Sequence, residues 1–173
     1  MAERKNAVTM MGNPVTIVGE DQKVGNPAPH FEALDNHLKI KKFDSFEGNV
    51  TVISSVPSLD TPVCDMETRR FNQIASELGP QVEIITISMD LPFAQSRWCG
   101  AAGVENVKTY SDHRDASFGN AYGVLIKEMR LLARAVFVVD TKGIISYIQV
   151  VAEMSNEPDY DQVIEHVKSL ILE

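Results

Sequence analysis

The residue of this chain best suited to covalent chemistry is Cys64, which lies where a strand-like pattern gives way to a helical one. A cysteine reacts as its thiolate. The first turn of a helix favours that anion, because its backbone N–H groups are unpaired and lie at the positive end of the helix dipole. The position of Cys64 therefore predicts a reactive sulfur, and we take this residue as the candidate nucleophile.

The residues on either side of Cys64 predict the elements that position it. Residues 49–55 (NVTVISS) form a short β-branched run, which is typical of a buried strand. Thr61 is a favourable N-cap, and Pro62 suits the first helical position because its missing N–H would have no partner there. Apolar residues then recur at helical spacing until Gly79, where we expect the helix to end.

A purely structural role for Cys64 remains open on this local pattern alone. Most cysteines in globular proteins are small buried hydrophobes, and a single cysteine near a helix start does not by itself indicate reactivity. Asp65, the next residue, also opposes a thiolate because its carboxylate carries the same charge. The choice between the two roles rests on the residue types found elsewhere in the chain.

The composition predicts one globular domain over residues 1–173, with 44% apolar residues and a net charge of −8. This charge, without any basic block, disfavours nucleic acid and anionic membranes as partners. The N-terminus has no apolar stretch, and no apolar run approaches the roughly 20 residues of a membrane span, so we expect a cytoplasmic protein. In that compartment a cysteine pair is more often catalytic or redox-sensing than structural. Two cysteines cannot form a four-cysteine zinc site, and no ligand cluster or glycine-rich loop points to a metal, flavin or nucleotide cofactor.

The remaining segments alternate between strand-like and helix-like patterns, which predicts an α/β fold with one mixed sheet and helices on both faces. Residues 39–46 are amphiphilic but short, and we expect a loop or a helical turn there. Asp90 resembles the cap of a short helix that Gly100 and Gly103 would loosen or end. We further expect a hairpin within residues 8–18, strands at 30–34, 81–88, 107–111, 133–140 and 144–151, and helices at 116–122 and 160–172.

Pro57, Thr61 and Cys64 together spell P-x-x-x-T-x-x-C, which resembles the active-site signature of the peroxiredoxins. Within that superfamily, several segments are similar to the thiol peroxidases of bacteria. They are residues 58–64 (SLDTPVC), 91–99 (LPFAQSRWC), 121–124 (AYGV) and 134–140 (RAVFVVD), with 13–16 (NPVT) and 158–160 (PDY) extending the match over almost the whole chain.

The resemblance implies a thioredoxin-like fold with an N-terminal β-hairpin and a role for each residue of the signature. Cys64 would be the peroxidatic cysteine, which attacks a hydroperoxide and becomes a sulfenic acid. Thr61 would place its hydroxyl near the sulfur and the peroxide, and Pro57 would shape the pocket and shield the sulfur. Arg134 corresponds to the family's active-site arginine; it would stabilise the thiolate and offset the charge of Asp65, with Arg69 and Arg70 as weaker candidates.

Cys99 corresponds to the family's resolving cysteine, which would attack the sulfenic acid and form a disulfide with Cys64. A disulfide needs Cα atoms roughly 4.4–6.8 Å apart, so we expect local unwinding around one or both cysteines during turnover. Each assignment has a structural alternative. Thr61 suits a plain N-cap, Pro57 a strand terminator, Arg134 a strand end that reaches solvent, and Cys99 a buried position beside Trp98.

The family also implies alkyl or lipid hydroperoxides as substrates, thioredoxin as the reductant, a homodimer as the working form and no cofactor. Other functions remain to be weighed. Cys64 and Arg70 fit the C-x5-R spacing of a phosphatase loop, but Asp65 and Glu67 would repel a phosphate dianion. A cysteine hydrolase would need a histidine partner, and the four histidines are scattered outside any motif: His30, His37, His113 and His166. A redox sensor or a thiol-dependent chaperone stays open, and catalytic turnover would distinguish a peroxidase from either.

Overall fold

The computed structural model describes residues 2–46 and 48–171. Its helices are α1 (Pro62–Leu78), α2 (Pro92–Ala102), α3 (Ser117–Tyr122) and α4 (Tyr160–Ile171). Its strands are β1 (Glu3–Met10), β2 (Asn13–Val18), β3 (Phe31–Leu34), β4 (Ile40–Phe43), β5 (Val50–Ser55), β6 (Val82–Ser88), β7 (Val107–Ser111), β8 (Leu125–Ile126), β9 (Leu131–Leu132), β10 (Ala135–Val139) and β11 (Ile145–Val150).

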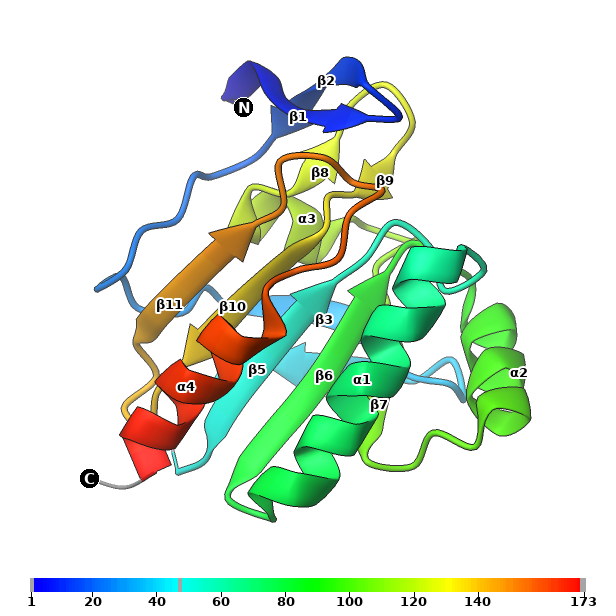
Figure 1. Cartoon of the computed structure of the whole chain (residues 1–173). Helices are drawn as coiled ribbons and strands as arrows, with labels where there is room; N and C mark the ends of the chain where they lie inside the picture. The colour runs from blue at the N-terminus through cyan, green and yellow to red at the C-terminus, as the bar shows by residue number, and fades with distance from the viewer. Residues whose placement is uncertain (1, 47, 172–173) are drawn as a thin grey trace.

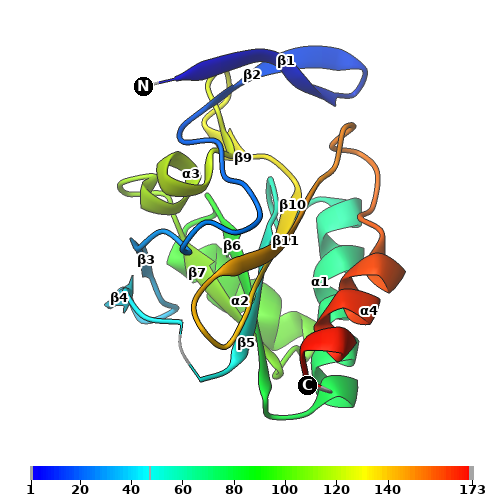
Figure 2. The same cartoon turned by 90° about the vertical axis from the view of Figure 1, so that its left-hand side faces the viewer.

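A seven-stranded mixed sheet in the order β11-β10-β5-β6-β7-β3-β4 forms the centre of the molecule (Figure 1). β5, β6 and β7 run parallel, whereas β10 is antiparallel to β5. α1 and α4 cover one face of this sheet, and α3 lies on the other face (Figure 2). Every residue of β5 is buried, as expected for a strand with both faces covered. The predicted mixed sheet with helices on both faces is confirmed.

Apolar side chains attach the helices to both faces of the sheet. On one face, Phe71 of α1 and Val163 of α4 belong to a cluster that includes Val52 and Ile84 of the sheet. On the other face, Phe118 of α3 lies in a second cluster with Phe137 of β10. Because the sheet is packed from both sides, the strand ends that lead into the loops are held in fixed positions.

The predicted N-terminal hairpin is confirmed: β1 and β2 pair antiparallel around a turn at Met11 and Gly12. The hairpin pairs with two further strands in the order β1-β2-β8-β9. These four strands form a second sheet at one end of the molecule (Figure 1). Two-residue strands are too short to show a periodic pattern, so the sequence did not predict them. β1 is also tied to the segment after β11, because Thr9 N–H donates to Ala152 O at 2.8 Å and Thr9 O accepts the Met154 N–H at 2.9 Å.

Two local predictions were wrong. Residues 39–46 contain the strand β4, not a loop or helical turn, because β4 pairs with β3 and stacks Phe43 on Phe31 with ring centroids 4.4 Å apart. Asp90 does not cap α2, whose N-cap is Leu91 without a side-chain hydrogen bond. The Asp90 carboxylate instead accepts hydrogen bonds from the Ser58 hydroxyl at 2.7 Å and the Leu59 N–H at 2.8 Å.

The helix ends agree with the sequence patterns. α1 ends at Gly79 and α2 at Gly103, whose left-handed conformation favours glycine. α4 runs from Tyr160 to Ile171 as predicted, and Leu172 lies outside the described residues. No helix in the described part of the chain combines the length and the apolar character that a bilayer crossing requires.

Candidate active site

Cys64 lies in the first turn of α1, the helix that follows β5 in the chain. The predicted cap is confirmed, because the Thr61 hydroxyl oxygen accepts the Cys64 N–H at 3.4 Å and its proton is donated to Ser58 O at 3.1 Å. The Cys64 side chain is fully buried and packs in a small cluster with Val56 and Leu59. The sulfur is therefore held beside the helix N-terminus and shielded from bulk water.

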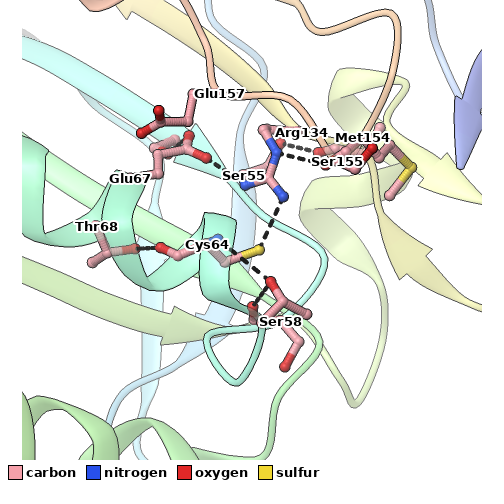
Figure 3. A network of polar contacts seen from close by, with 12 residues as sticks. Ser55, Ser58, Cys64, Glu67, Thr68, Arg134, Met154, Ser155 and Glu157 are labelled. Carbon is pink, nitrogen blue, oxygen red and sulfur yellow. Dashed lines mark hydrogen bonds and ion pairs between the residues drawn. The ribbon is translucent and has the colours of Figure 1, made fainter. Parts of the chain in front are cut away.

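Arg134 brings a buried positive charge to this sulfur (Figure 3). It directly precedes β10, and the antiparallel register pairs Ala135 with Ser55 at the end of β5, beside the loop that carries Cys64. Arg134 Nη2 lies 3.2 Å from Cys64 Sγ, and Nε donates to Met154 O at 2.9 Å. Only 2% of its surface is exposed, so Arg134 is not a strand-end arginine that reaches solvent.

The carboxylate that pairs with Arg134 is Glu67, and the expectation that Arg134 offsets the charge of Asp65 is wrong. Glu67 Oε2 lies 2.6 Å from Arg134 Nη1, and both side chains are buried. Asp65 instead accepts hydrogen bonds from Arg69 Nε at 2.9 Å and Trp98 Nε1 at 2.7 Å. Arg69, one of the weaker candidates, is therefore the residue that offsets Asp65.

Glu67 is held in an apolar setting by few polar contacts. Its Oε1 accepts a hydrogen bond from the Ser54 hydroxyl at 2.9 Å, and its side chain is fully buried. Burial raises the pKa of Glu67 to about 7, although Arg134 and Ser54 act in the opposite direction. The negative charge of Glu157, which lies beside Glu67 in Figure 3, raises this pKa further. Glu67 is therefore harder to ionise than a glutamate in water.

A cavity of about 270 Å³ lies beside the start of α1 and reaches Arg134. Nearly all of its wall is apolar, and the polar residues that line it are Thr61, Arg134 and Ser155. Its apolar wall consists of Met10, Met11, Pro57, Pro62, Val63 and Met154. Such a lining suits a small molecule that has an apolar body and one polar end.

Cys99 lies on α2, apart from this cavity. It is partly exposed, and its Sγ lies 3.4 Å from the Thr109 hydroxyl. Both cysteines are free thiols in this structure. Trp98, the residue before Cys99, packs against the cluster around Cys64 and donates to Asp65. The structural alternative for Cys99, a buried position beside Trp98, is therefore wrong about burial, because Cys99 is partly exposed and its thiol contacts Thr109.

The comparisons with known proteins agree with this geometry. A family model described as Redoxin matches residues 23–164. The thiol peroxidase of Bacillus subtilis (strain 168) is 54% identical over 164 residues, which are 95% of this chain and 98% of that protein. This chain belongs to the thiol peroxidases of the redoxin family. The resemblance drawn from its sequence motifs is thereby confirmed.

Other thiol peroxidases and their relatives are similar over the same extent. The thiol peroxidase of Listeria monocytogenes serovar 1/2a (strain EGD-e) is 52% identical over 161 residues, which cover 93% of this chain and 97% of that protein. The crystal structure of a peroxiredoxin-like protein from Aquifex aeolicus matches with a TM-score of 0.90 at 44% identity, covering 95% of this chain and 97% of that one. The thiol peroxidase from Chromobacterium violaceum shares the fold, with a TM-score of 0.83 at 21% identity.

In this thiol peroxidase the structure brings four of the five expected site residues together. Pro57, Thr61 and Arg134 line one cavity, and Arg134 contacts the sulfur of Cys64. The fifth residue, Cys99, belongs to another helix. Within the described residues, no group of three histidine, cysteine, aspartate or glutamate side chains is placed to hold a metal ion.

Sequence reasoning missed Glu67 as a member of this thiol peroxidase site. The signal was present, because Glu67 follows Cys64 by three residues and so lies on the same face of the helix. Arg134 also occurs in an apolar segment, where a buried cation requires an anionic partner. The methionines of the cavity wall carried no such signal, since Met10 and Met11 reach the site only through the packing of the hairpin.

Proposed function

We propose that this thiol peroxidase reduces hydroperoxides through Cys64 as the peroxidatic cysteine and Cys99 as the resolving cysteine. The observation that carries the assignment is the 3.2 Å contact between Arg134 Nη2 and the buried sulfur of Cys64 at the N-terminus of α1. A guanidinium and a helix N-terminus both favour a thiolate over a thiol. Such an environment makes Cys64 the stronger nucleophile of the two cysteines.

In the first step the Cys64 thiolate attacks the terminal oxygen of the hydroperoxide. A sulfur–oxygen bond forms as the oxygen–oxygen bond breaks, and the leaving alkoxide takes up a proton to become an alcohol, or water when the substrate is hydrogen peroxide. Arg134 stabilises negative charge at the reacting atoms, and the Thr61 hydroxyl gives the peroxide a hydrogen-bonding partner. Pro57 and the apolar cavity wall exclude water and accommodate the organic group of alkyl or lipid hydroperoxides.

In the second step the Cys99 thiolate attacks the sulfenic sulfur, so that a disulfide forms and water leaves. Cys64 is fully buried and Cys99 is held at Thr109, so this step requires local unwinding around the two cysteines. Reduced thioredoxin then returns the disulfide to two thiols. The thioredoxin reductant, the homodimer and the cytoplasmic location of this cycle rest on the family resemblance.

The deciding experiment counts free thiols and measures intact mass before and after one equivalent of cumene hydroperoxide. The wild-type protein is expected to lose both thiols and gain no oxygen. The Cys99→Ser variant is expected to gain oxygen at Cys64, whereas Cys64→Ser is expected to keep its remaining thiol. Survival of both wild-type thiols would refute the peroxidase assignment.

Turnover separates the peroxidase from a redox sensor that uses the same two cysteines. With thioredoxin, its reductase and NADPH present, a peroxidase consumes many equivalents of hydroperoxide for each protein molecule. A sensor would consume one equivalent and stop. Failure of thioredoxin, but success of a small dithiol, would leave the peroxidase assignment intact and show that the proposed reductant is wrong.

A further inference from the structure

We propose that Glu67 and Cys64 share Arg134 as their common counterion, so that an ionised Glu67 opposes formation of the Cys64 thiolate and a protonated Glu67 permits it. In this arrangement Glu67 is a positioning residue that holds Arg134 against the sulfur and sets the pH range in which the sulfur is reactive. The inference rests on the proposed role of Cys64 and adds to it a residue that the peroxidase signature does not contain.

The geometry shows one cation between two acidic groups (Figure 3). Arg134 uses each of its three nitrogens for a different partner. Nη1 contacts Glu67 Oε2 at 2.6 Å, Nη2 contacts Cys64 Sγ at 3.2 Å, and Nε donates to Met154 O at 2.9 Å. Because Glu67 and Cys64 bind neighbouring nitrogens of one planar group, the position of the guanidinium at the sulfur depends on Glu67.

The single positive charge of Arg134 cannot neutralise Glu67 and Cys64 when both acids are ionised. Glu67 and Cys64 are fully buried and Arg134 is 2% exposed, so a carboxylate and a thiolate together would leave one excess negative charge in an apolar setting. The groups that face Glu67 from α4 and the segment before it give no further positive charge. They are Glu157, whose charge opposes ionisation of Glu67, and Tyr160, whose hydroxyl donates to Glu157 at 2.9 Å.

The proton that Glu67 carries has a defined place in the structure. Oε2 accepts from Arg134, so the proton belongs on Oε1, where the Ser54 oxygen at 2.9 Å can accept it once the Ser54 hydroxyl has rotated. The neutral carboxyl group then keeps both of its contacts. Burial raises the pKa of Glu67 to about 7, which agrees with a carboxyl group that is harder to ionise than a glutamate in water.

Because both acids contact the same guanidinium, the charge on one opposes the charge on the other. When Glu67 is neutral, Arg134 is available to the thiolate. When Glu67 is ionised, its carboxylate competes for Arg134 and favours the neutral thiol. A glutamine at this position reproduces the neutral carboxyl group, because its amide nitrogen can donate to Ser54 while its oxygen accepts from Arg134.

The test measures the thiolate absorbance of Cys64 as a function of pH in a Cys99→Ser background, where Cys64 is the only thiol. In Glu67→Gln the thiolate is expected to form at a pH about one unit lower than in the parent, the size of effect that a nearby unit charge has on an ionisable group. Glu77→Gln is the matched control. It removes the same charge from an exposed position on α1 and is expected to leave the curve unchanged.

The second measurement is kcat/KM for cumene hydroperoxide against pH in the protein with both cysteines. Glu67→Gln is expected to shift the rising limb of this profile towards lower pH by a similar amount. Glu67→Ala is expected to lose at least tenfold at every pH, because Arg134 loses the contact that holds it at the sulfur. If Glu67→Ala fails to fold, Glu67→Gln alone decides.

Two outcomes would overturn the inference: a Glu67→Gln curve that coincides with that of the parent, or one that moves to higher pH. The latter would mean that the Glu67 carboxylate supports the thiolate instead of competing with it. The thiolate absorbance needs no peroxide, so it tests this inference even if the protein does not reduce hydroperoxides. Lack of hydroperoxide reduction by the wild type would instead refute the proposed function.

Discussion

At the scale of single residues, the chemistry of this thiol peroxidase depends on Arg134 as a buried cation with three acceptors. Its guanidinium has little freedom to move, because Glu67 and Met154 O hold it from two sides while its third nitrogen contacts Cys64. Preorganised donors of this kind stabilise charge without having to rearrange during the reaction. We therefore propose that Arg134 acts on both the thiolate and the atoms that become charged during peroxide cleavage.

Replacing Arg134 by methionine, which keeps much of the volume and removes the charge, is expected to lower kcat/KM for hydroperoxides by about 100-fold or more. Arg70→Met is the matched control, because Arg70 lies on α1 and contacts Gln73, away from the sulfur. It is expected to change kcat/KM less than about twofold. Stopped-flow measurement of the peroxide step checks both values, and a loss below about tenfold in Arg134→Met would contradict the assigned role.

At the scale of secondary structure, α1 and α2 are joined next to the two cysteines. Asp65, which follows Cys64, accepts the N–H of Trp98, which precedes Cys99, at 2.7 Å. Arg69 strengthens this connection, since it pairs with Asp65 and its Nη1 donates to Ala102 O at 3.3 Å. In the proposed cycle, these contacts would have to open before a disulfide forms between Cys64 and Cys99.

Asp65→Ala is therefore expected to accelerate the step from sulfenic acid to disulfide by about tenfold, which corresponds to the loss of about 1.4 kcal/mol of interaction. The fluorescence of Trp98, the single tryptophan of the chain, follows this step after a pulse of hydroperoxide. Asp60→Ala is the control, because it removes an exposed carboxylate close to the start of α1. A disulfide step in Asp65→Ala as slow as in the control would show that these contacts do not limit resolution.

At the scale of the whole molecule, three distant parts of the chain enclose the cavity that we propose binds the substrate. Met10 and Met11 come from the N-terminal hairpin, Thr61 directly precedes α1, and Met154 follows β11. The hairpin is fixed there by the hydrogen bonds of Thr9 to Ala152 and Met154. The apolar wall is thus a product of the fold, and it faces the part of the cavity that an organic group would occupy.

Met11→Ser is expected to lower kcat/KM for cumene hydroperoxide about fivefold, because the organic group of the substrate loses an apolar side chain against which it packs. The value for hydrogen peroxide, which has no organic group, is expected to stay the same. Met129→Ser removes another exposed methionine, in the turn between β8 and β9, and serves as the control. An equal loss for both peroxides would indicate damage to the chemistry and not to substrate recognition.

The sequence by itself determined the features that depend on neighbouring residues. Thr61 and Pro62 predict the start of α1, and therefore the place of Cys64 in its first turn, because capping is a local interaction. The order of strands and helices likewise determined the fold class. It follows from the periodicity of apolar residues, which indicates the buried face of each element. The motif spacing around both cysteines and Arg134 was sufficient to identify the family.

Only the tertiary structure decided which charged groups meet. The register between β5 and β10 places Arg134 beside Cys64 and Glu67, and the packing of α2 on α1 brings Trp98 to Asp65. β4 likewise forms because β3 is there to pair with it. These contacts join residues far apart in the chain, and their partners follow from the packing of whole elements, which no local pattern encodes.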